Sequence, residues 1–210
     1  MNPEVYLIIV TLSCLAVFIA SIMINTGRIK TELSVAVKQD ISSEEMRQAE
    51  EKVSRFLEKN HLKPGTHISI IGQALNIRIN DMEERIPGQA HLGNPDENGI
   101  MTVTFRRGLS QQERTFAFAH ECGHIINEDT VPIDRPEGRH KAYVEQAADY
   151  VAAALLMPLD QIYAFLVERD YHGASPRKRM KLVRGLCRTY GVDNIIALRR
   201  IREVYTLKEA

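Results

Sequence analysis

The run His120-Glu121-Cys122-Gly123-His124 constrains this chain more than any other feature of its sequence. Two histidines four residues apart lie on one face of an α-helix, one turn from each other, so their rings can reach a common point. Neutral imidazole nitrogens at such a point are ligands for Zn²⁺, and the glutamate between them can reach a metal-bound water without being a ligand. The spacing therefore predicts half of a zinc site. Two ordinary surface histidines are the alternative.

The residues before this run have the pattern of a helix with a well-defined start. Ser110 and Glu113 form an S-x-x-E capping box, in which each side chain satisfies a backbone N–H at the start of a helix. Segment 99–105, just upstream, is rich in β-branched and aromatic residues and predicts a strand. The motif is thus expected in a strand–turn–helix unit, and this context favours a metal site over two surface histidines.

A catalytic zinc site normally has a third protein ligand, which should come from another element. Segment 142–156 is rich in alanine and predicts a helix that ends before Pro158. On that helix Glu145 shares a face with alanines, where a carboxylate needs a cationic partner such as a metal ion. Asp149, one turn on, could accept the second N–H of a ligand histidine. A salt bridge from Glu145 to Lys141 and a surface position for Asp149 are the ordinary alternatives.

Two segments together resemble the ImmA/IrrE family of zinc metallopeptidases. Residues 116–124 have the pattern F-x-x-A-H-E-x-G-H, and residues 145–158 end in A-x-L-L-M-P. The resemblance extends over about residues 41–205. It implies an α+β fold of the zincin-like class, mostly helical with a small antiparallel sheet.

The resemblance also implies a role for each residue of a gluzincin-type site. The zinc ligands of the family correspond to His120, His124 and Glu145, and its catalytic glutamate corresponds to Glu121. Such a glutamate takes a proton from the zinc-bound water and passes it to the leaving amine. Members often have a second acid where this chain has Ala147, but that change removes no ligand.

Residues 5–24 form an apolar run without a single charge. A helix of about 20 residues crosses the ~30 Å hydrocarbon core of a bilayer. We therefore expect a transmembrane anchor within residues 1–24, a linker over 25–41 and a peptidase domain over 42–210. A signal peptide, which usually has a shorter apolar region after a basic start, and a buried core helix are the alternatives.

Basic residues after the apolar run predict its orientation. Arg28 and Lys30 follow it directly, so the positive-inside rule predicts a single-pass protein of the cell membrane with a cytoplasmic domain. The three cysteines, Cys14, Cys122 and Cys187, suggest no disulfide framework, which agrees with a reducing cytosol.

The remaining segments predict more helices than strands. In chain order we expect a helix from Ser42 or Ser43, strands over 76–80 and 85–92, a loop over 128–139, and helices starting near Pro158, after Ser175 and after Asp193. The pattern over 66–75 is ambiguous between helix and strand, and the resemblance favours a helix. Pro87 predicts an edge position for the second strand.

The helix after Ser175 is strongly basic, with Arg177, Lys178, Arg179, Lys181, Arg184 and Arg188. Anionic lipid, nucleic acid or an acidic protein could bind it, and a solvated helix face is the ordinary alternative. The whole chain has 27 basic and 27 acidic residues, so its net charge provides no argument for a nucleic-acid partner.

These observations predict a membrane-anchored zinc endopeptidase that cleaves a cytoplasmic protein, which the resemblance suggests is a transcriptional regulator. A zinc-binding regulatory module that does not cleave, and a nucleic-acid-binding regulator using residues 175–205, are the alternatives.

Spacing does not select the residue that stabilises the oxyanion; the candidates are Tyr143, His140, Tyr150, Tyr171 and His172.

Overall fold

The computed structural model describes residues 41–80, 84–86, 88–128 and 139–209, and the side chains of 139–142 are not among them. The expected anchor lies outside the described residues, as does the linker apart from Ile41. Within the described part, no single helix is long and apolar enough to cross a membrane. Two consecutive helices are long and apolar enough for a membrane span only when they are taken together. They are Tyr143–Leu156 and Leu159–Glu168, and the chain bends by 64° between them.

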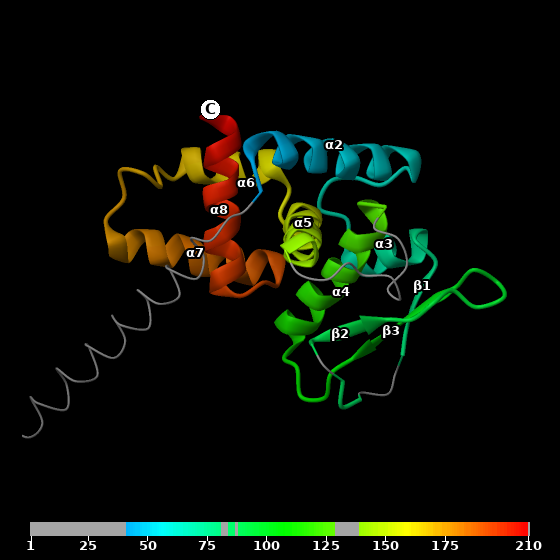
Figure 1. Ribbon diagram of the computed structural model, residues 1–210. Coiled ribbons are helices and arrows are strands. Elements are labelled where there is room, and N and C mark those ends of the chain that lie inside the picture. The colour runs from blue at the N-terminus through cyan, green and yellow to red at the C-terminus, as the bar shows by residue number, and fades with distance from the viewer. Residues whose placement is uncertain (1–40, 81–83, 87, 129–138, 210) are drawn as a thin grey trace, which may run out of the picture. The chain divides into compact units, whose positions relative to one another are not determined.

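The fold is mostly helical with a small sheet, which confirms the expected α+β class (Figure 1). The elements are α2 (Ser43–Lys59), α3 (Ile68–Ala74), β1 (Ile77–Ile79), β2 (Ala90–Leu92), β3 (Met101–Phe105), α4 (Gln111–Ile126), α5 (Arg139–Leu156), α6 (Leu159–Glu168), α7 (Pro176–Tyr190) and α8 (Asn194–Lys208). All of them belong to one compact unit, Gln39–Ala210.

The sheet is mixed, so the expectation of an antiparallel sheet is wrong for one of its two pairings. Its strand order is β1-β3-β2, with β2 antiparallel to β3 and β1 parallel to β3. β2 and β3 are consecutive strands, and a short connection between neighbours returns the chain antiparallel. β1 is separated from β3 by β2 and its flanking loops, which are long enough to bring the chain back in the same direction. The segment expected as a strand over 85–92 is shorter, Ala90–Leu92, and lies at an edge as expected.

Local capping explains where several helices begin. Ser110 and Glu113 form the expected capping box at the start of α4, with the Ser110 hydroxyl accepting the Glu113 N–H at 3.3 Å. Ser175 caps α7, which has Pro176 at its first position, and Asp193 caps α8. These contacts involve residues three positions apart, which is why the sequence alone predicts them.

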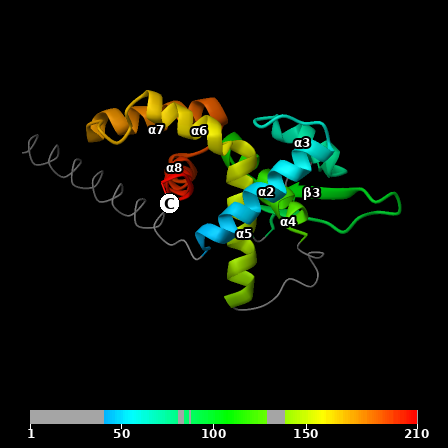
Figure 2. The same cartoon turned by 90° about the horizontal axis from the view of Figure 1, so that it is seen from above.

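α4 and α5 form the centre of the unit. α4 lies between the sheet and α5, and α6, α7 and α8 gather on the opposite side of α5 (Figures 1 and 2). Figure 2 shows α2 crossing α5, and the two helices are in contact. One hydrophobic cluster joins α2, α3, the sheet, α4 and α5, and a second fills the space among α6, α7 and α8. The HExxH helix is therefore packed on both sides before any ligand is considered.

Candidate metal site

α4 directs two imidazole rings toward one point. The Nε2 atoms of His120 and His124 are 3.0 Å apart, and the ring planes are inclined by 84°. His124 is 5% exposed. Because the histidines are one turn apart on a helix held between the sheet and α5, their approach follows from the i, i+4 spacing.

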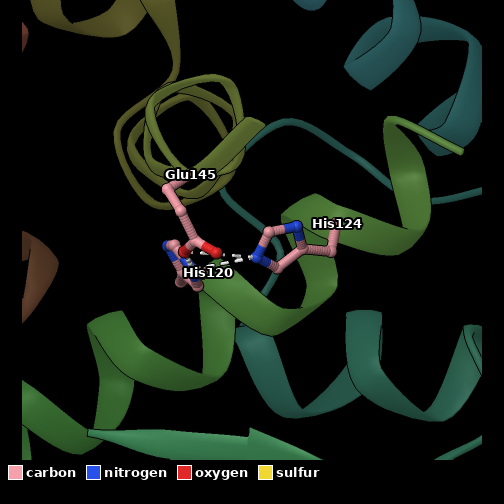
Figure 3. A group of neighbouring side chains, drawn as sticks. All are labelled: His120, His124 and Glu145. Atoms are coloured by element: carbon pink, nitrogen blue, oxygen red, sulfur yellow. Dashed lines mark hydrogen bonds and ion pairs between the residues drawn. The ribbon is translucent and has the colours of Figure 1, made fainter. Parts of the chain in front are cut away.

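α5 adds a carboxylate at the same point. Glu145 Oε2 lies 3.1 Å from His120 Nε2 and 3.7 Å from His124 Nε2. Figure 3 shows the Glu145 side chain descending from α5 onto the two rings of α4. One donor atom from each of the three residues lies within 4.8 Å of the others, so this cluster could hold a metal ion.

The donor set and its spacing fit a divalent ion such as Zn²⁺. In a tetrahedral zinc site with metal–ligand distances of about 2.0–2.1 Å, neighbouring donor atoms lie about 3.3 Å apart. The separations here are 3.0, 3.1 and 3.7 Å. Two nitrogens and one oxygen also form the donor set of open, catalytic zinc sites. These residues therefore satisfy the chemistry of a three-ligand metal centre.

Asp149 holds the far side of the His120 ring. Its Oδ1 lies 2.8 Å from His120 Nδ1, one helical turn beyond Glu145 on α5. A carboxylate at this distance favours the tautomer that has the proton on Nδ1, since the N–H can donate to Oδ1. When the ring is neutral, the lone pair of Nε2 is then directed toward Glu145 and His124.

The three charged groups of the site shift each other's pKa values. Burial lowers the pKa of His120, but hydrogen bonds to Asp149 and Glu145 outweigh it and raise that pKa to about 9. Hydrogen bonds from His120 and His124 hold the pKa of Glu145 well below its usual range. Burial raises the pKa of Asp149, yet its bonds to His120 and Arg199 leave that pKa lowered. The point where the side chains meet therefore favours positive charge, either a proton or a cation.

The three residues between the histidines are buried. Glu121 is 3% exposed, and Cys122 has no exposed surface. Burial raises the pKa of the Cys122 thiol, so the thiolate that a metal or an oxidant requires is disfavoured. Both Cys122 and Cys187 are free thiols. Cys122 is therefore a packed thiol of the protein interior.

Three of the five candidates for stabilising an oxyanion have partners elsewhere. The Tyr150 hydroxyl donates to Glu50 of α2 at 2.7 Å. Tyr171 and His172 stack with Tyr205 of α8, at ring-centroid distances of 6.3 and 4.0 Å. These contacts favour structural roles for the three.

The other two candidates are less constrained by the structure. Tyr143 is 36% exposed and precedes Glu145 by two residues on α5, but it hydrogen-bonds Glu45 of α2. The side chain of His140 lies outside the described residues.

The sequence contained no signal for Arg199, which also contacts the site. Its Nη1 lies 3.0 Å from Asp149 Oδ2, although the two residues are 50 positions apart. No local periodicity connects a residue of α8 with one of α5. An alignment showing that the two positions vary together would be the kind of signal able to find such a pair.

A small mixed sheet supporting a helix with an HExxH motif, and a glutamate from the next helix beside the two histidines, define a metallopeptidase-like domain. The sequence profile of the IrrE N-terminal-like domain, peptidase family M78, matches residues 74–202. Because this match covers more than half of the chain, the chain belongs to that family, which confirms the resemblance seen in the sequence.

One solved structure similar to this chain is a Mycobacterium tuberculosis transcriptional regulator, with a TM-score of 0.50 and 15% sequence identity. The similarity covers 73% of this chain and 46% of that chain, so this chain spans about half the length of that structure. At this level of identity the likeness shows a shared fold. No match was found among curated proteins.

Proposed function

We propose that this protein is a zinc-dependent endopeptidase of the gluzincin type. The observation that supports the proposal is the convergence of His120, His124 and Glu145 within 4.8 Å, from two helices that share no local sequence constraint. Two surface histidines would have no reason to meet a carboxylate from another helix. A purely structural zinc site would normally have four protein ligands, and among the described residues the cluster has three.

Zinc bound by these three side chains would supply a Lewis acid that polarises the scissile carbonyl and activates water for attack. Glu121 accepts the proton that the attacking water loses. When the C–N bond breaks, Glu121 donates that proton to the departing amine, so the base returns to its starting state. Asp149 keeps the proton of His120 on Nδ1, and thereby keeps Nε2 available as a ligand.

The experiment that tests this proposal separates metal binding from cleavage. Purified full-length protein should contain about one zinc per chain by elemental analysis. Glu121→Gln should keep that zinc, because Glu121 is not among the three clustered donors. The variant should lose cleavage. Cleavage is measured as new protein N-termini, which should appear in cells that express the wild-type protein and be missing from cells that express the variant. Full cleavage by Glu121→Gln would show that the base is assigned wrongly.

The same experiment distinguishes a regulatory module that binds zinc without cleaving. Such a module would bind zinc in both forms and produce no new N-termini in cells that express the wild-type protein. The substrate class we propose is a cytoplasmic regulatory protein. The N-termini that appear only with the wild-type protein would identify the substrate and its cleavage site. New termini confined to extracytoplasmic proteins would contradict a cytoplasmic substrate.

We further propose that residues 5–24 tether the protein to the cell membrane with the peptidase domain in the cytoplasm. The uncharged apolar run and the basic residues Arg28 and Lys30 after it support this topology. A cysteine tag on the peptidase domain should resist an impermeant thiol reagent in intact cells and react after lysis. Labelling in intact cells would reverse the orientation, and extraction of the protein from membranes at alkaline pH would contradict the tether.

A second candidate function, nucleic-acid binding, is favoured by one surface feature. Arg177, Lys181, Arg184 and Arg188 are exposed on α7 with the spacing of a single helix face, and α7 contains no acidic residue. Among the described residues, none of the four has an ion-pair partner. A solved structure of similar fold is a transcriptional regulator. Filter binding of duplex DNA at two salt concentrations tests this function: a steep loss of affinity with salt supports it, and no salt dependence ends it.

A further inference from the structure

Each oxygen of the Asp149 carboxylate contacts a different residue. One carboxylate oxygen, Oδ1, lies 2.8 Å from His120 Nδ1, and the other, Oδ2, accepts a hydrogen bond from Arg199 Nη1 at 3.0 Å. Arg199 Nη2 also donates to the backbone carbonyl of Asp149 at 3.3 Å. The guanidinium group therefore holds both the side chain and the main chain of the residue that orients His120.

Arg199 is itself held in place by one residue of its own helix and one of α4. Its Nε lies 3.6 Å from Glu203 Oε1, one turn further along α8. Its guanidinium carbon lies 5.9 Å from the ring centroid of Phe116, which belongs to α4. The Arg199 side chain is only 20% exposed. A planar guanidinium group with partners on several sides has little freedom to rotate, so it can serve as a fixed reference for Asp149.

The neighbouring arginine has a different set of partners. Arg200 is completely buried, and it contacts Glu50 at 2.8 Å and the Met157 carbonyl at 2.9 Å. Those contacts join α8 to α2 and to the end of α5, away from the clustered donor atoms. Of the two adjacent arginines, Arg199 is the one that contacts Asp149.

We propose that Arg199 is a positioning residue of the metal centre. It fixes the Asp149 carboxylate in the rotamer that accepts the Nδ1–H of His120, and so keeps Nε2 of that ring aimed at the metal. The Asp149 side chain is 31% exposed, so without Arg199 it can turn toward water and release the ring. This inference rests on the proposed metal site and adds to it a residue from α8, a helix whose apolar side chains belong to the second hydrophobic cluster.

The test compares Arg199→Gln with a matched ion-pair variant on the same helix. Lys208 of α8 pairs with Asp160 Oδ1 of α6 at 2.7 Å, far along the sequence from any clustered donor, so Lys208→Gln removes an α8 ion pair that does not contact Asp149. Zinc affinity of the full-length protein is measured by competition with a chromogenic chelator. The visible spectrum of the Co²⁺-loaded protein reports the ligand geometry.

Arg199→Gln should weaken zinc binding by up to about 10-fold to 100-fold, which is the usual cost of losing an outer-shell partner such as Asp149, the residue that Arg199 holds. It should also change the Co²⁺ spectrum, whereas Lys208→Gln should change neither. Arg199→Lys should recover part of the affinity, because it restores the charge without the two-pronged geometry. In Asp149→Asn, adding Arg199→Gln should cause little further loss, since Arg199 acts through Asp149.

Two results would overturn the inference. One is a folded Arg199→Gln protein, or Arg199→Lys if the glutamine variant does not fold, with wild-type zinc affinity and an unchanged Co²⁺ spectrum. The other is full additivity of the Asp149 and Arg199 substitutions. If wild type itself bound no zinc, the proposed function would fail together with the inference, so the wild-type measurement distinguishes the two failures.

Discussion

Gly123 of α4 lies directly against the backbone of Ala148 of α5: a Cβ at position 123 would be 2.5 Å from the Ala148 carbonyl oxygen. That separation is far shorter than any ordinary van der Waals contact, and the obstacle is backbone rather than a flexible side chain. The missing side chain therefore allows α4 and α5 to approach closely. This approach occurs beside the metal cluster, between the two histidines of α4 and the span of α5 that carries Glu145 and Asp149.

Gly123→Ala should accordingly destabilise the fold and weaken metal binding together. Forcing a methyl group into a packed contact costs about 1–3 kcal/mol, and more where the backbone must move. Chemical denaturation measures the change in the free energy of unfolding. Gly185→Ala in α7 is the control: its nearest atom would be 3.9 Å away, in Phe165, so it should be neutral or stabilising by up to about 1 kcal/mol. Equal stability of the two variants would contradict the close-contact argument.

Glu145→Ala should abolish stoichiometric zinc binding. It removes one of the three donors and leaves two histidines, which is too few for a tight site. Elemental analysis of the purified protein checks this expectation. Glu51→Ala, an exposed acid on α2, should retain wild-type zinc content. Retention of one zinc per chain by Glu145→Ala would show that the third ligand is elsewhere.

Zinc affinity should fall as the pH is lowered. Without metal, the pKa of His120 is raised to about 9, so its ring is mostly protonated at neutral pH. A ligand imidazole must be neutral, so binding below about pH 9 displaces a proton, and the apparent affinity should change about tenfold per pH unit. Calorimetric titrations in buffers of different ionisation enthalpy would count the released proton. No proton release at pH 7 would contradict the charge state described for His120.

Arg200→Met should be among the most destabilising single substitutions outside the metal site. Arg200 is 0% exposed and compensates Glu50 and Glu203, and Glu203 is itself 1% exposed. Removing one partner of a buried ion pair costs about 3–5 kcal/mol, because the other charge remains buried. Chemical denaturation would measure the loss. Arg200→Met combined with Glu203→Gln should be less destabilised than Arg200→Met alone, and a larger loss in the double variant would exclude this explanation.

Most helices were predictable because their signals are local. The Ser110–Glu113 box, Pro176 after Ser175 and the Asp193 cap all depend on residues within one turn, and each is present in the structure. The family resemblance predicted α3, where the local pattern was ambiguous. The loop expected over 128–139 ends at least one residue too late, because α5 begins at Arg139, and residues 129–138 lie outside the described part of the chain.

The pairing of the strands could not be predicted from local sequence patterns. Alternating apolar residues predicted the strand near Ile77, and β-branched and aromatic residues predicted the strand near Met101. Neither signal contains information on which strand pairs with which, or in what direction. The parallel pairing of β1 with β3 depends on the path of the chain between them. It also depends on the contacts of β1 with α3 and of β3 with α4, and neither factor can be read from a short window of residues.

The sequence by itself determined the family, the helix carrying two histidines on one face, and a carboxylate on the following helix, because helical periodicity and capping are properties of short segments. Only the tertiary structure decided how closely α4 and α5 approach, that β1 pairs in parallel with β3, and that Arg199 of α8 hydrogen-bonds Asp149. These features arise from packing between segments up to 50 residues apart, where the energy of a contact depends on the whole fold and not on the spacing of residues along the chain.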